Sequence, residues 1–284
     1  MKNNNIVELV KDALIKAGSS FREDKKRAYC NFIKKEFNNC SKWALETILE
    51  NANVAEKNKS PLCDDTGIPH LLLEIGRDVS ITGQMLLEIK QGIKEGLKEL
   101  PGRPMAILGN ESERISQEKG ISSLSEDVDP APFLIRYIDE NVVRLNILLF
   151  GGGPAIRGKT FRVFHKHNTK IVLDEIIDWA KQSVSELGCT PCTLGIGIGR
   201  SHFEATSLML EALVDGKYDS QSDMERYITN EVNKTNVGPL GLGGDSSVLA
   251  TFMKVGPQRA SGVRIVCLRP CCCFEPRIAT VDLL

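Results

Sequence analysis

The chain is organised around residues 60–67, Ser60-Pro61-Leu62-Cys63-Asp64-Asp65-Thr66-Gly67, in which a thiol stands directly beside two carboxylates. Pro61 and Gly67 indicate a loop, and the apolar run over 71–75 that follows predicts a strand. We therefore expect a tight loop that displays a thiol and acids at the edge of a buried element, where proteins commonly place chemistry. The alternative interpretation is a buried cysteine beside an aspartate-capped turn.

Length and composition indicate a globular chain with a sizeable core. Of its 284 residues, 42% are hydrophobic and 26% are charged, and the net charge is −1. Because the net charge is close to zero, the protein has no overall positive electrostatic field that would attract nucleic acid or an anionic membrane. An anionic ligand therefore needs a local basic site. The N-terminus lacks an apolar signal region, and no run of about 18 apolar residues occurs. We therefore expect a cytoplasmic protein with no nucleic-acid and no membrane partner.

Hydrophobic periodicity predicts a mixed α/β (α+β) fold with residues 1–58 as a helical lead-in. The length suits one large or two small domains, and because no interdomain linker is evident, we expect a single domain over residues 1–284. Helices are expected over 5–17, 24–37, 41–58, 82–98, 171–187, 203–213 and 222–234, and strands over 70–76, 132–138, 142–150, 193–199 and 262–268. Ser41 and Thr82 are expected N-caps. Residues 109–130 are polar and poor in aromatic side chains, which predicts a mobile excursion. No internal repeat is evident in the sequence.

Seven of the nine cysteines gather in three places: Cys63 alone, Cys189 with Cys192, and Cys267 with the triplet Cys271, Cys272 and Cys273. A chain expected in the cytoplasm does not use such cysteines as a disulfide framework. The triplet is poorly spaced for zinc, because neighbouring side chains of a strand point to opposite faces. Single cysteines from three distant loops suit an iron–sulfur cluster with three thiolate ligands and one open iron. Buried, unreactive thiols remain the alternative at 189 and 192.

Glycine gathers over residues 151–153, 195–199 and 238–244. Because glycine lets backbone amides approach a ligand closely, each segment either cradles an anion or forms a compact turn. None has the phosphate-loop pattern, and the spacing over 195–199 is not the dinucleotide fingerprint.

Four of these motifs together resemble one enzyme family. Cys63-Asp64-Asp65-Thr66-Gly67 is similar to the Cys-Gln-Asp-Thr-Gly signature of the iron–sulfur hydro-lyases of the class I fumarase and tartrate dehydratase α-subunit family. Residues 151–153 are similar to its triple glycine, and Cys189 with 195–199 resembles its Cys-Pro-Pro…Gly-Val-Gly-Ile-Gly block. Residues 238–244 resemble its Gly-Pro-Gln-Gly-Leu-Gly-Gly block. The four motifs follow the family's order over roughly residues 40–282.

The resemblance implies a [4Fe–4S] cluster on Cys63, Cys189 and a third cysteine, with substrate bound at the fourth iron. Cys272 fits the third position best, five residues before Arg277, although either neighbouring cysteine could serve. The fold then has glycine-rich loops around a metal cluster.

The resemblance also implies residues that contact substrate. Arg103, forty residues after Cys63, stands where the family binds a substrate carboxylate, and a guanidinium suits bidentate capture of that group. A solvated loop arginine is the alternative. Asp65 matches the catalytic aspartate, and Asp64 and Gly152 match substrate-binding positions.

The chain departs from the family in four places. Asp64 stands where the family has a glutamine, and the Asn-Thr motif expected after Arg103 is absent. The family has a histidine ahead of the third ligand, and this chain has none at that place, where Gln258 and Arg259 are the nearest residues. A basic stretch over 156–167 follows the triple glycine, either as an exposed strand and turn or as positive charge near the substrate.

The resemblance thus implies the α subunit of a hydro-lyase that works with a β subunit, as αβ or α2β2. The expected reaction is the reversible addition or removal of water on a small dicarboxylic acid of the fumarate/malate or tartrate kind. The alternative is a diverged, non-catalytic metal- or cluster-binding protein of the same fold.

Overall fold

The computed structural model describes residues 5–284 and confirms a mixed α/β fold that opens with helices. The chain divides into two compact units. The first unit comprises the chain up to Phe21, Ala52–Gly151 and Arg277–Leu284, and the second comprises Arg22–Asn51 and Gly152–Pro276. Helix α3 (Asn39–Asn58) contributes residues to both. No helix among residues 5–284 is long and apolar enough to cross a membrane.

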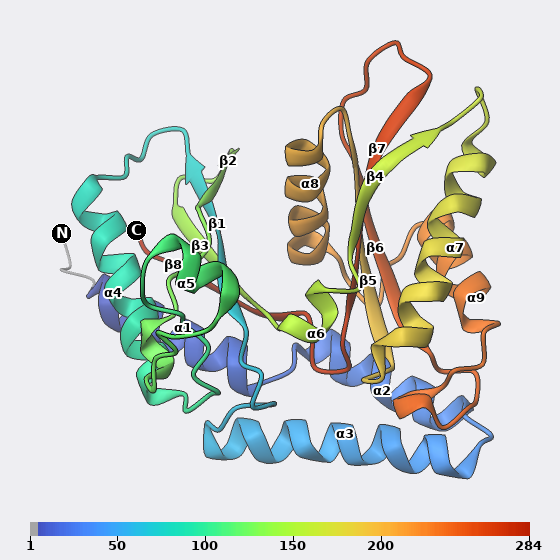
Figure 1. The fold of residues 1–284 in the computed structure, drawn as a ribbon, viewed down its shortest axis with the longest axis horizontal. Helices are drawn as coiled ribbons and strands as arrows, with labels where there is room; N and C mark the ends of the chain where they lie inside the picture. The colour runs from blue at the N-terminus through green and yellow to red at the C-terminus, as the bar shows by residue number, and fades with distance from the viewer. Residues whose placement is uncertain (1–4) are drawn as a thin grey trace. The chain divides into compact units, whose positions relative to one another are not determined.

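The first unit contains a four-stranded sheet with the order β2-β1-β3-β8 (Figure 1). Its elements are α1 (Ile6–Ser19), β1 (Ile68–Gly76), α4 (Gly83–Glu99), α5 (Glu111–Ser116), the 3-10 turn η1 (Ser125–Asp127), β2 (Leu134–Ile138), β3 (Val143–Phe150) and β8 (Arg277–Asp282). Strands β1 and β2 are parallel, whereas β3 runs antiparallel to both β1 and β8. The end of β3 therefore lies beside the start of β1, where Ile68 pairs with Phe150.

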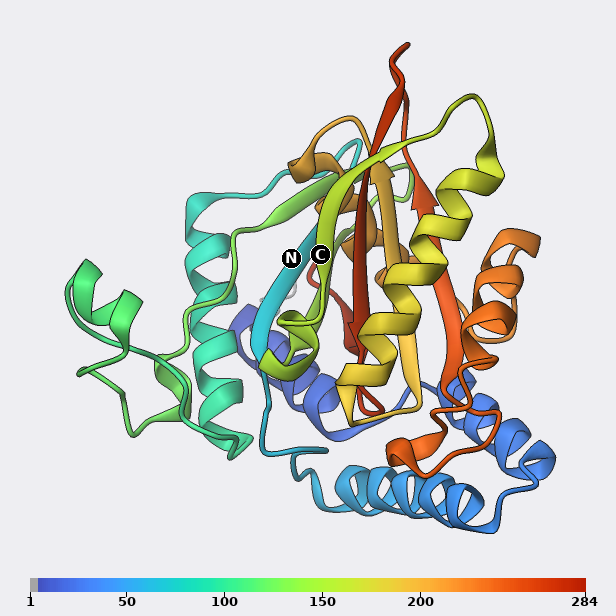
Figure 2. The same ribbon diagram turned by 45° about the vertical axis from the view of Figure 1, so that its right-hand side comes forward.

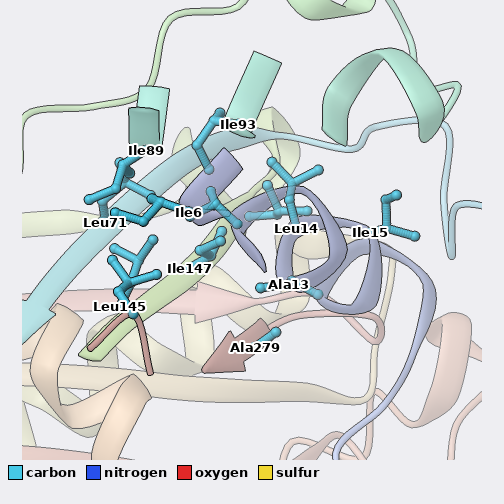
Figure 3. Packing of buried hydrophobic residues seen from close by; sticks show 14 of the residues in the cluster. Ile6, Ala13, Leu14, Ile15, Leu71, Ile89, Ile93, Leu145, Ile147 and Ala279 are labelled. Carbon is cyan, nitrogen blue, oxygen red and sulfur yellow. The ribbon is translucent and has the colours of Figure 1, made fainter. Parts of the chain in front are cut away.

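Helices α1 and α4 pack on this sheet and on each other to form the apolar core of the first unit. Figure 3 shows Leu14 of α1, Ile93 of α4 and Leu71 of β1 among its buried side chains. The two helices approach closely because α4 carries Gly92, where a Cβ would lie 2.7 Å from the Val10 side chain. Thr82 caps α4 as predicted, since its hydroxyl accepts from the Met85 amide at 3.2 Å.

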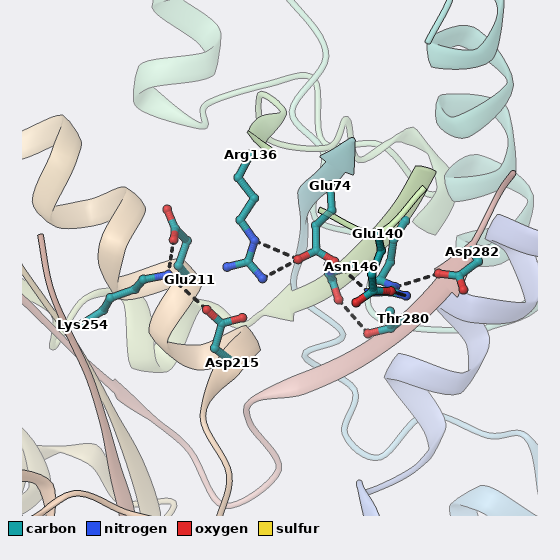
Figure 4. Close-up of polar contacts among 10 residues, drawn as sticks. Glu74, Arg136, Glu140, Asn146, Glu211, Asp215, Lys254, Thr280 and Asp282 are labelled. Carbon is teal, nitrogen blue, oxygen red and sulfur yellow. Dashed lines mark hydrogen bonds and ion pairs between the residues drawn. The ribbon is translucent and has the colours of Figure 1, made fainter. Parts of the chain in front are cut away.

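Polar side chains join neighbouring strands of this sheet (Figure 4). Glu74 on β1 is buried and pairs with Arg136 on β2. Arg144 on β3 donates to Asp282 on β8 at 2.7 Å. Each of these ion pairs joins residues that lie opposite each other on neighbouring strands, so the pairs support the order of the strands in the sheet.

The second unit contains a sheet with the order β4-β7-β5-β6. Its elements are α2 (Glu23–Lys35), α6 (Gly152–Ala155), β4 (Lys159–Phe164), α7 (Thr169–Leu187), β5 (Cys192–Gly199), α8 (His202–Asp215), α9 (Asp223–Asn233), the 3-10 turn η2 (Pro239–Gly241), β6 (Val248–Val255) and β7 (Val263–Cys271). Helix α8 covers one face of the sheet, and α7 with α9 covers the other, as Figures 1 and 2 show. A buried apolar cluster lies between α7, α9 and the sheet.

The two sheets share one strand pattern, although the sequence shows no internal repeat. In each, a central strand (β1 or β5) has a parallel neighbour on one side (β2 or β6). On its other side lies an antiparallel neighbour (β3 or β7), which pairs in turn with an antiparallel edge strand (β8 or β4). Because of this pattern, the loop before each central strand lies beside the end of its antiparallel neighbour.

The structure differs from the sequence prediction in several local features. Ser41 is not the N-cap of α3, because the Asn38 carboxamide accepts from the Cys40 and Ser41 amides at 3.0 and 3.2 Å. The Ser41 hydroxyl donates instead to the carbonyl of Gly243. The polar segment 109–130 contains the short helix α5, which Asn110 and Glu113 cap reciprocally. Strands β6 and β8 were not predicted. The basic stretch over 156–167 contains the mostly exposed strand β4, which agrees with its interpretation as an exposed strand and turn.

Candidate functional site

Three sequence motifs of the second unit meet at one end of its sheet. Strands β5 and β6 begin at this end, where Cys192 pairs with Val248. Strand β7 ends there, because Cys271 pairs with Thr193. The segment that contains Cys189, the glycine-rich loop over 238–244 and the cysteine triplet are therefore brought together by strand register.

Cys189 is exposed and lies between the end of α7 and the start of β5. Its carbonyl accepts a hydrogen bond from the Cys273 amide at 2.8 Å, which ties it to the triplet. The next residue, Thr190, joins the glycine-rich loop: its hydroxyl donates to the Gly238 carbonyl, and its carbonyl accepts from the Leu240 amide at 3.0 Å. Backbone bonds thus hold all three segments at this end of the sheet.

The three adjacent cysteines have different surroundings. Cys271 and Cys273 are buried, whereas Cys272 between them is half-buried. Burial raises the pKa of the Cys271 thiol. The hydrogen bond with the Cys272 thiol, and then burial, raise the pKa of Cys273. Cys272 is therefore the most accessible thiol of the triplet.

The turn that follows β7 is held by buried side chains. Tyr29 of α2 donates through its hydroxyl to the Cys273 carbonyl at 2.8 Å. Lys25, one helical turn earlier, donates through Nζ to the Glu275 carbonyl at 2.7 Å. The Glu275 amide closes the turn by donating to the Cys272 carbonyl at 2.9 Å.

Charged side chains are buried around this turn. Lys25 and Arg269 are 1% and 7% exposed, and Glu275 is 0% exposed. Arg269 pairs with the Glu275 carboxylate at 3.1 Å. Burial lowers the pKa of Lys25 to about 8, against the opposing influence of the triplet and of Glu275. Lys25 and Arg269 thus place buried positive charge beside the triplet, and positive charge favours the thiolate form of a cysteine.

In the first unit, the loop over 63–67 precedes β1 and packs against the end of β3. Gly67 has φ +88°, and a Cβ there would collide with the carbonyl group of Phe150. Only glycine fits this combination of positive φ and close approach. The amide of Leu62 anchors the other side of the loop by donating to the Gly18 carbonyl at 2.9 Å.

Arg103 contacts this loop through both its backbone and its side chain. Its amide donates to the Asp64 carbonyl at 2.8 Å, and its guanidinium donates to the Asp64 carboxylate. The Arg103 guanidinium first, and then the Cys63 thiol at 3.5 Å, lower the pKa of Asp64. Both side chains of this ion pair are exposed, so it remains accessible to an anion from solvent.

Asp65 is half-buried, and Arg277 holds its backbone in place. Arg277 is buried at the start of β8 and donates through its guanidinium to the Asp65 carbonyl at 2.7 Å. The same guanidinium donates to the Leu149 carbonyl at the end of β3. Arg277 therefore links the loop over 63–67 to the sheet of the first unit.

The candidate residues are divided between the two units. The first unit contains Cys63, Asp64, Asp65 and Arg103, and the second contains Cys189, Cys272 and Gly152. Gly152 is exposed at the start of α6, where a Cβ would meet nothing within 4 Å. Within residues 5–284, no three His, Cys, Asp or Glu side chains form a ready site for a metal ion.

Sequence reasoning did not single out Lys25, Tyr29 or Arg269. Lys25 and Tyr29 lie about 250 residues from the turn that they contact, as the separations of 250 and 244 residues show. On sequence alone they are ordinary residues of an amphipathic helix, so only the tertiary contact identifies them.

Known proteins are similar to this protein over most of its chain. A protein of Methanocaldococcus jannaschii named "Putative L(+)-tartrate dehydratase subunit alpha" is 28% identical over 286 residues, covering 96% of this chain and 94% of its own length. The L(+)-tartrate dehydratase subunit alpha of Escherichia coli K12 is 20% identical, covering 83% of this chain and 77% of its own length. A "Putative fumarate hydratase class I" of Geobacillus stearothermophilus is 25% identical over 75% of this chain, which spans 42% of that longer protein.

These names denote hydro-lyases, enzymes that add or remove water, and they agree with the resemblance inferred from the motifs. The family model described as "Fumarate hydratase (Fumerase)" matches residues 7–282. The chain therefore belongs to the fumarate hydratase (Fumerase) family.

Proposed function

We propose that the chain is the α subunit of a [4Fe–4S]-dependent hydro-lyase that reversibly adds or removes water on a small dicarboxylic acid. Family membership and the names of the relatives support a hydro-lyase rather than a non-catalytic protein of the same fold. Two relatives are named as alpha subunits, which supports a separate β subunit as partner. Their names also support a substrate of the tartrate or fumarate kind.

The proposed cluster ligands are Cys63, Cys189 and Cys272. The observation that carries the proposal is the pairing of Cys189 with the triplet, through the 2.8 Å bond from the Cys273 amide, beside buried positive charge. Thiolates require such compensation when they lie near a protein interior. Accessibility supports Cys272 over Cys271 and Cys273, since both neighbours are buried.

The chain's own residues bind and orient the substrate in this proposal. When bound, the cluster supplies an open iron that acts as a Lewis acid on a substrate hydroxyl or carboxylate. Arg103 binds one substrate carboxylate. Asp64 lies beside this group as a negatively charged neighbour of Arg103. Asp65, whose backbone Arg277 fixes, is the carboxyl group that holds or accepts a proton. Gly152 offers space for close approach of a ligand to its backbone.

Anaerobic reconstitution with ferrous iron and sulfide, followed by iron and sulfide analysis, tests the ligand set. Cys63→Ser, Cys189→Ser and Cys272→Ser should each abolish iron incorporation. Cys30→Ser, at an exposed position of α2, and Cys192→Ser, at a buried position of β5, should retain it. Stoichiometric zinc without sulfide in the wild-type protein would overturn the cluster, and iron retained by Cys189→Ser but lost by Cys192→Ser would overturn the assignment.

A further inference from the structure

The sheet of the second unit has two edge strands, and side chains close one of them. Strand β6 forms this closed edge. The Gln221 carboxamide accepts from the Thr251 amide at 3.1 Å, and the Glu225 carboxylate accepts from the Met253 amide at 2.7 Å. The carboxamide of Asn233 accepts from two further amides at the start of the strand. Side-chain acceptors therefore take the place of a further strand beside β6.

Strand β4 forms the opposite edge of the same sheet (Figure 1). Its backbone pairs with β7 in continuous register, from Lys159 with Leu268 to Phe164 with Val263. Apart from this pairing, no hydrogen bond from residues 5–284 reaches the backbone of β4. An edge strand with an open side offers amides and carbonyls for pairing with another chain. The sheet thus has one closed edge and one open edge.

The segment that contains the open edge carries positive charge. Residues 156–167 include Arg157, Lys159, Arg162 and Lys166 and no acidic residue. Arg157 donates to backbone carbonyls, and Lys159 lies over the ring of a tryptophan. Throughout the part of the chain that the structure describes, no carboxylate forms an ion pair with any of these four cations. Their charge is therefore available to an acidic partner.

Two phenylalanines of β4 expose apolar surface beside these cations. Phe161 and Phe164 are 49% and 57% exposed. The guanidinium of Arg162 lies 5.5 and 5.6 Å from the centres of the two rings. Aromatic pairs and opposite-charge pairs between neighbouring strands stabilise a sheet. Strand β4 thus presents backbone, apolar and positively charged groups to one incoming segment.

Charge decides which kind of chain fits this edge. A second copy of β4 would bring cations opposite cations, and like charges on facing strands are destabilising. The basic side chains therefore oppose pairing between copies of this chain, as charged residues on edge strands commonly do. An extended segment that carries Asp or Glu meets both the open backbone and the positive charge.

We propose that the open edge of β4 is a docking site for an acidic, extended segment of the β subunit, which joins the sheet as a further strand. The inference rests on the proposed function, because the partner is the β subunit proposed there. Main-chain hydrogen bonds supply affinity in this mode of binding. The cations around Arg162 select an acidic segment.

Hydrogen–deuterium exchange tests the added strand on the wild-type chain. The partner is the β-type chain of the same organism, and exchange is compared with and without it. We expect the amides over 159–164 to exchange more slowly in the complex. The amides over 248–255 should exchange as in the isolated chain, because the edge of β6 is already closed.

Charge reversal tests the acidic character of the partner segment. Arg162→Glu should raise the Kd of the complex by roughly 10–100-fold. Its iron content, its thermal melt and its kcat at saturating β subunit should match the wild type. Lys42→Glu makes the same change of charge at an exposed position of α3 and should leave Kd unchanged. If Arg162→Glu does not fold, the exchange of the wild-type complex decides alone.

Failure of the docking site and failure of the proposed function give different results. An active wild-type complex in which the β4 amides exchange as in the isolated chain would overturn the docking site alone. A raised KM in Arg162→Glu at unchanged Kd would also overturn it, and would assign the basic segment to substrate attraction. A wild-type chain that forms no complex with the β-type chain would overturn the proposed two-subunit enzyme together with the docking site.

Discussion

Arg103 is positioned by its backbone, so its side chain is available for binding. The Arg103 amide donates to the Asp64 carbonyl at 2.8 Å, and this bond positions the backbone of Arg103 independently of the guanidinium. The guanidinium pairs with the Asp64 carboxylate, and both groups are exposed. Exposed ion pairs are weak because water competes for both charges. In the proposed function, a substrate carboxylate therefore replaces the Asp64 carboxylate as the partner of Arg103.

Arg103→Lys should weaken kcat/KM by roughly 10–100-fold, because lysine keeps the charge and loses the planar fork. The measurement is steady-state kinetics of the complex reconstituted with a β subunit. Iron content should remain at the wild-type value, which separates substrate binding from cluster assembly. Wild-type kinetics in this variant would show that the substrate carboxylate lies elsewhere.

Gly67→Ala should destabilise the protein by about 1–3 kcal/mol, the usual penalty for a side chain at positive φ. The added methyl group also collides with the Phe150 carbonyl, so the loop over 63–67 must shift. Chemical denaturation measures the loss. Gly83→Ala is the matched control, since a Cβ at Gly83 meets nothing within 4 Å. Equal stability of the two variants would contradict this account.

At the scale of elements, α2 is set in place by the side chain of Asp24 in its first turn. The carboxylate accepts from the Lys25 amide at 3.0 Å and from the Tyr218 amide at 3.1 Å. Arg22 pairs with the same carboxylate and also donates to the Gly216 carbonyl at 2.6 Å. These contacts join the start of α2 to the segment after α8. They therefore help to position Lys25 and Tyr29.

Asp24→Asn should cost about 1–3 kcal/mol at neutral pH, the range for a hydrogen bond to a charged group. Burial raises the pKa of Asp24, but the bonds and charge of Arg22 and two backbone amides outweigh it and lower that pKa. A lowered carboxyl pKa stabilises the fold above the unfolded value of about 3.9 and is lost as pH falls through the folded value. The difference between wild type and variant should therefore shrink below about pH 4.

Urea denaturation between pH 2 and 7 measures this difference, with Asp223→Asn as the control. Asp223 occupies the equivalent first turn of α9, but its side chain is 97% exposed in its pair with Arg226. Exposed pairs of this kind contribute little. Equal losses in the two variants, or a loss at Asp24 that persists in acid, would refute the role of Asp24.

At the scale of the whole molecule, each of the two units contains an apolar core within residues 5–284. The chain belongs to a family with relatives named as alpha subunits. We expect the isolated, reconstituted chain to bind iron and sulfide and to show little hydro-lyase activity. Addition of a β subunit should restore activity on a small dicarboxylate. Coupled assays of the chain with and without that partner check the expectation, and full activity from this chain alone would contradict it.

The sequence by itself determined most of the helices and the family. The helices at 5–17 and 82–98 were predictable because their periodicity and the Thr82 cap are encoded by residues within a few positions of one another. The family followed from motifs whose order along the chain needs no tertiary information. Strands β6 and β8 were missed because their neighbours, rather than their own alternation, specify them.

Only the tertiary structure decided which residues surround the candidate site. The register of β5, β6 and β7 brings Cys189 to the triplet, and the burial of Cys271 and Cys273 distinguishes Cys272. Lys25 reaches the same turn across 250 residues of sequence. Contacts over such distances depend on how strands pair and how helices pack. No local pattern of residues encodes them, because many pairings satisfy the same periodicity.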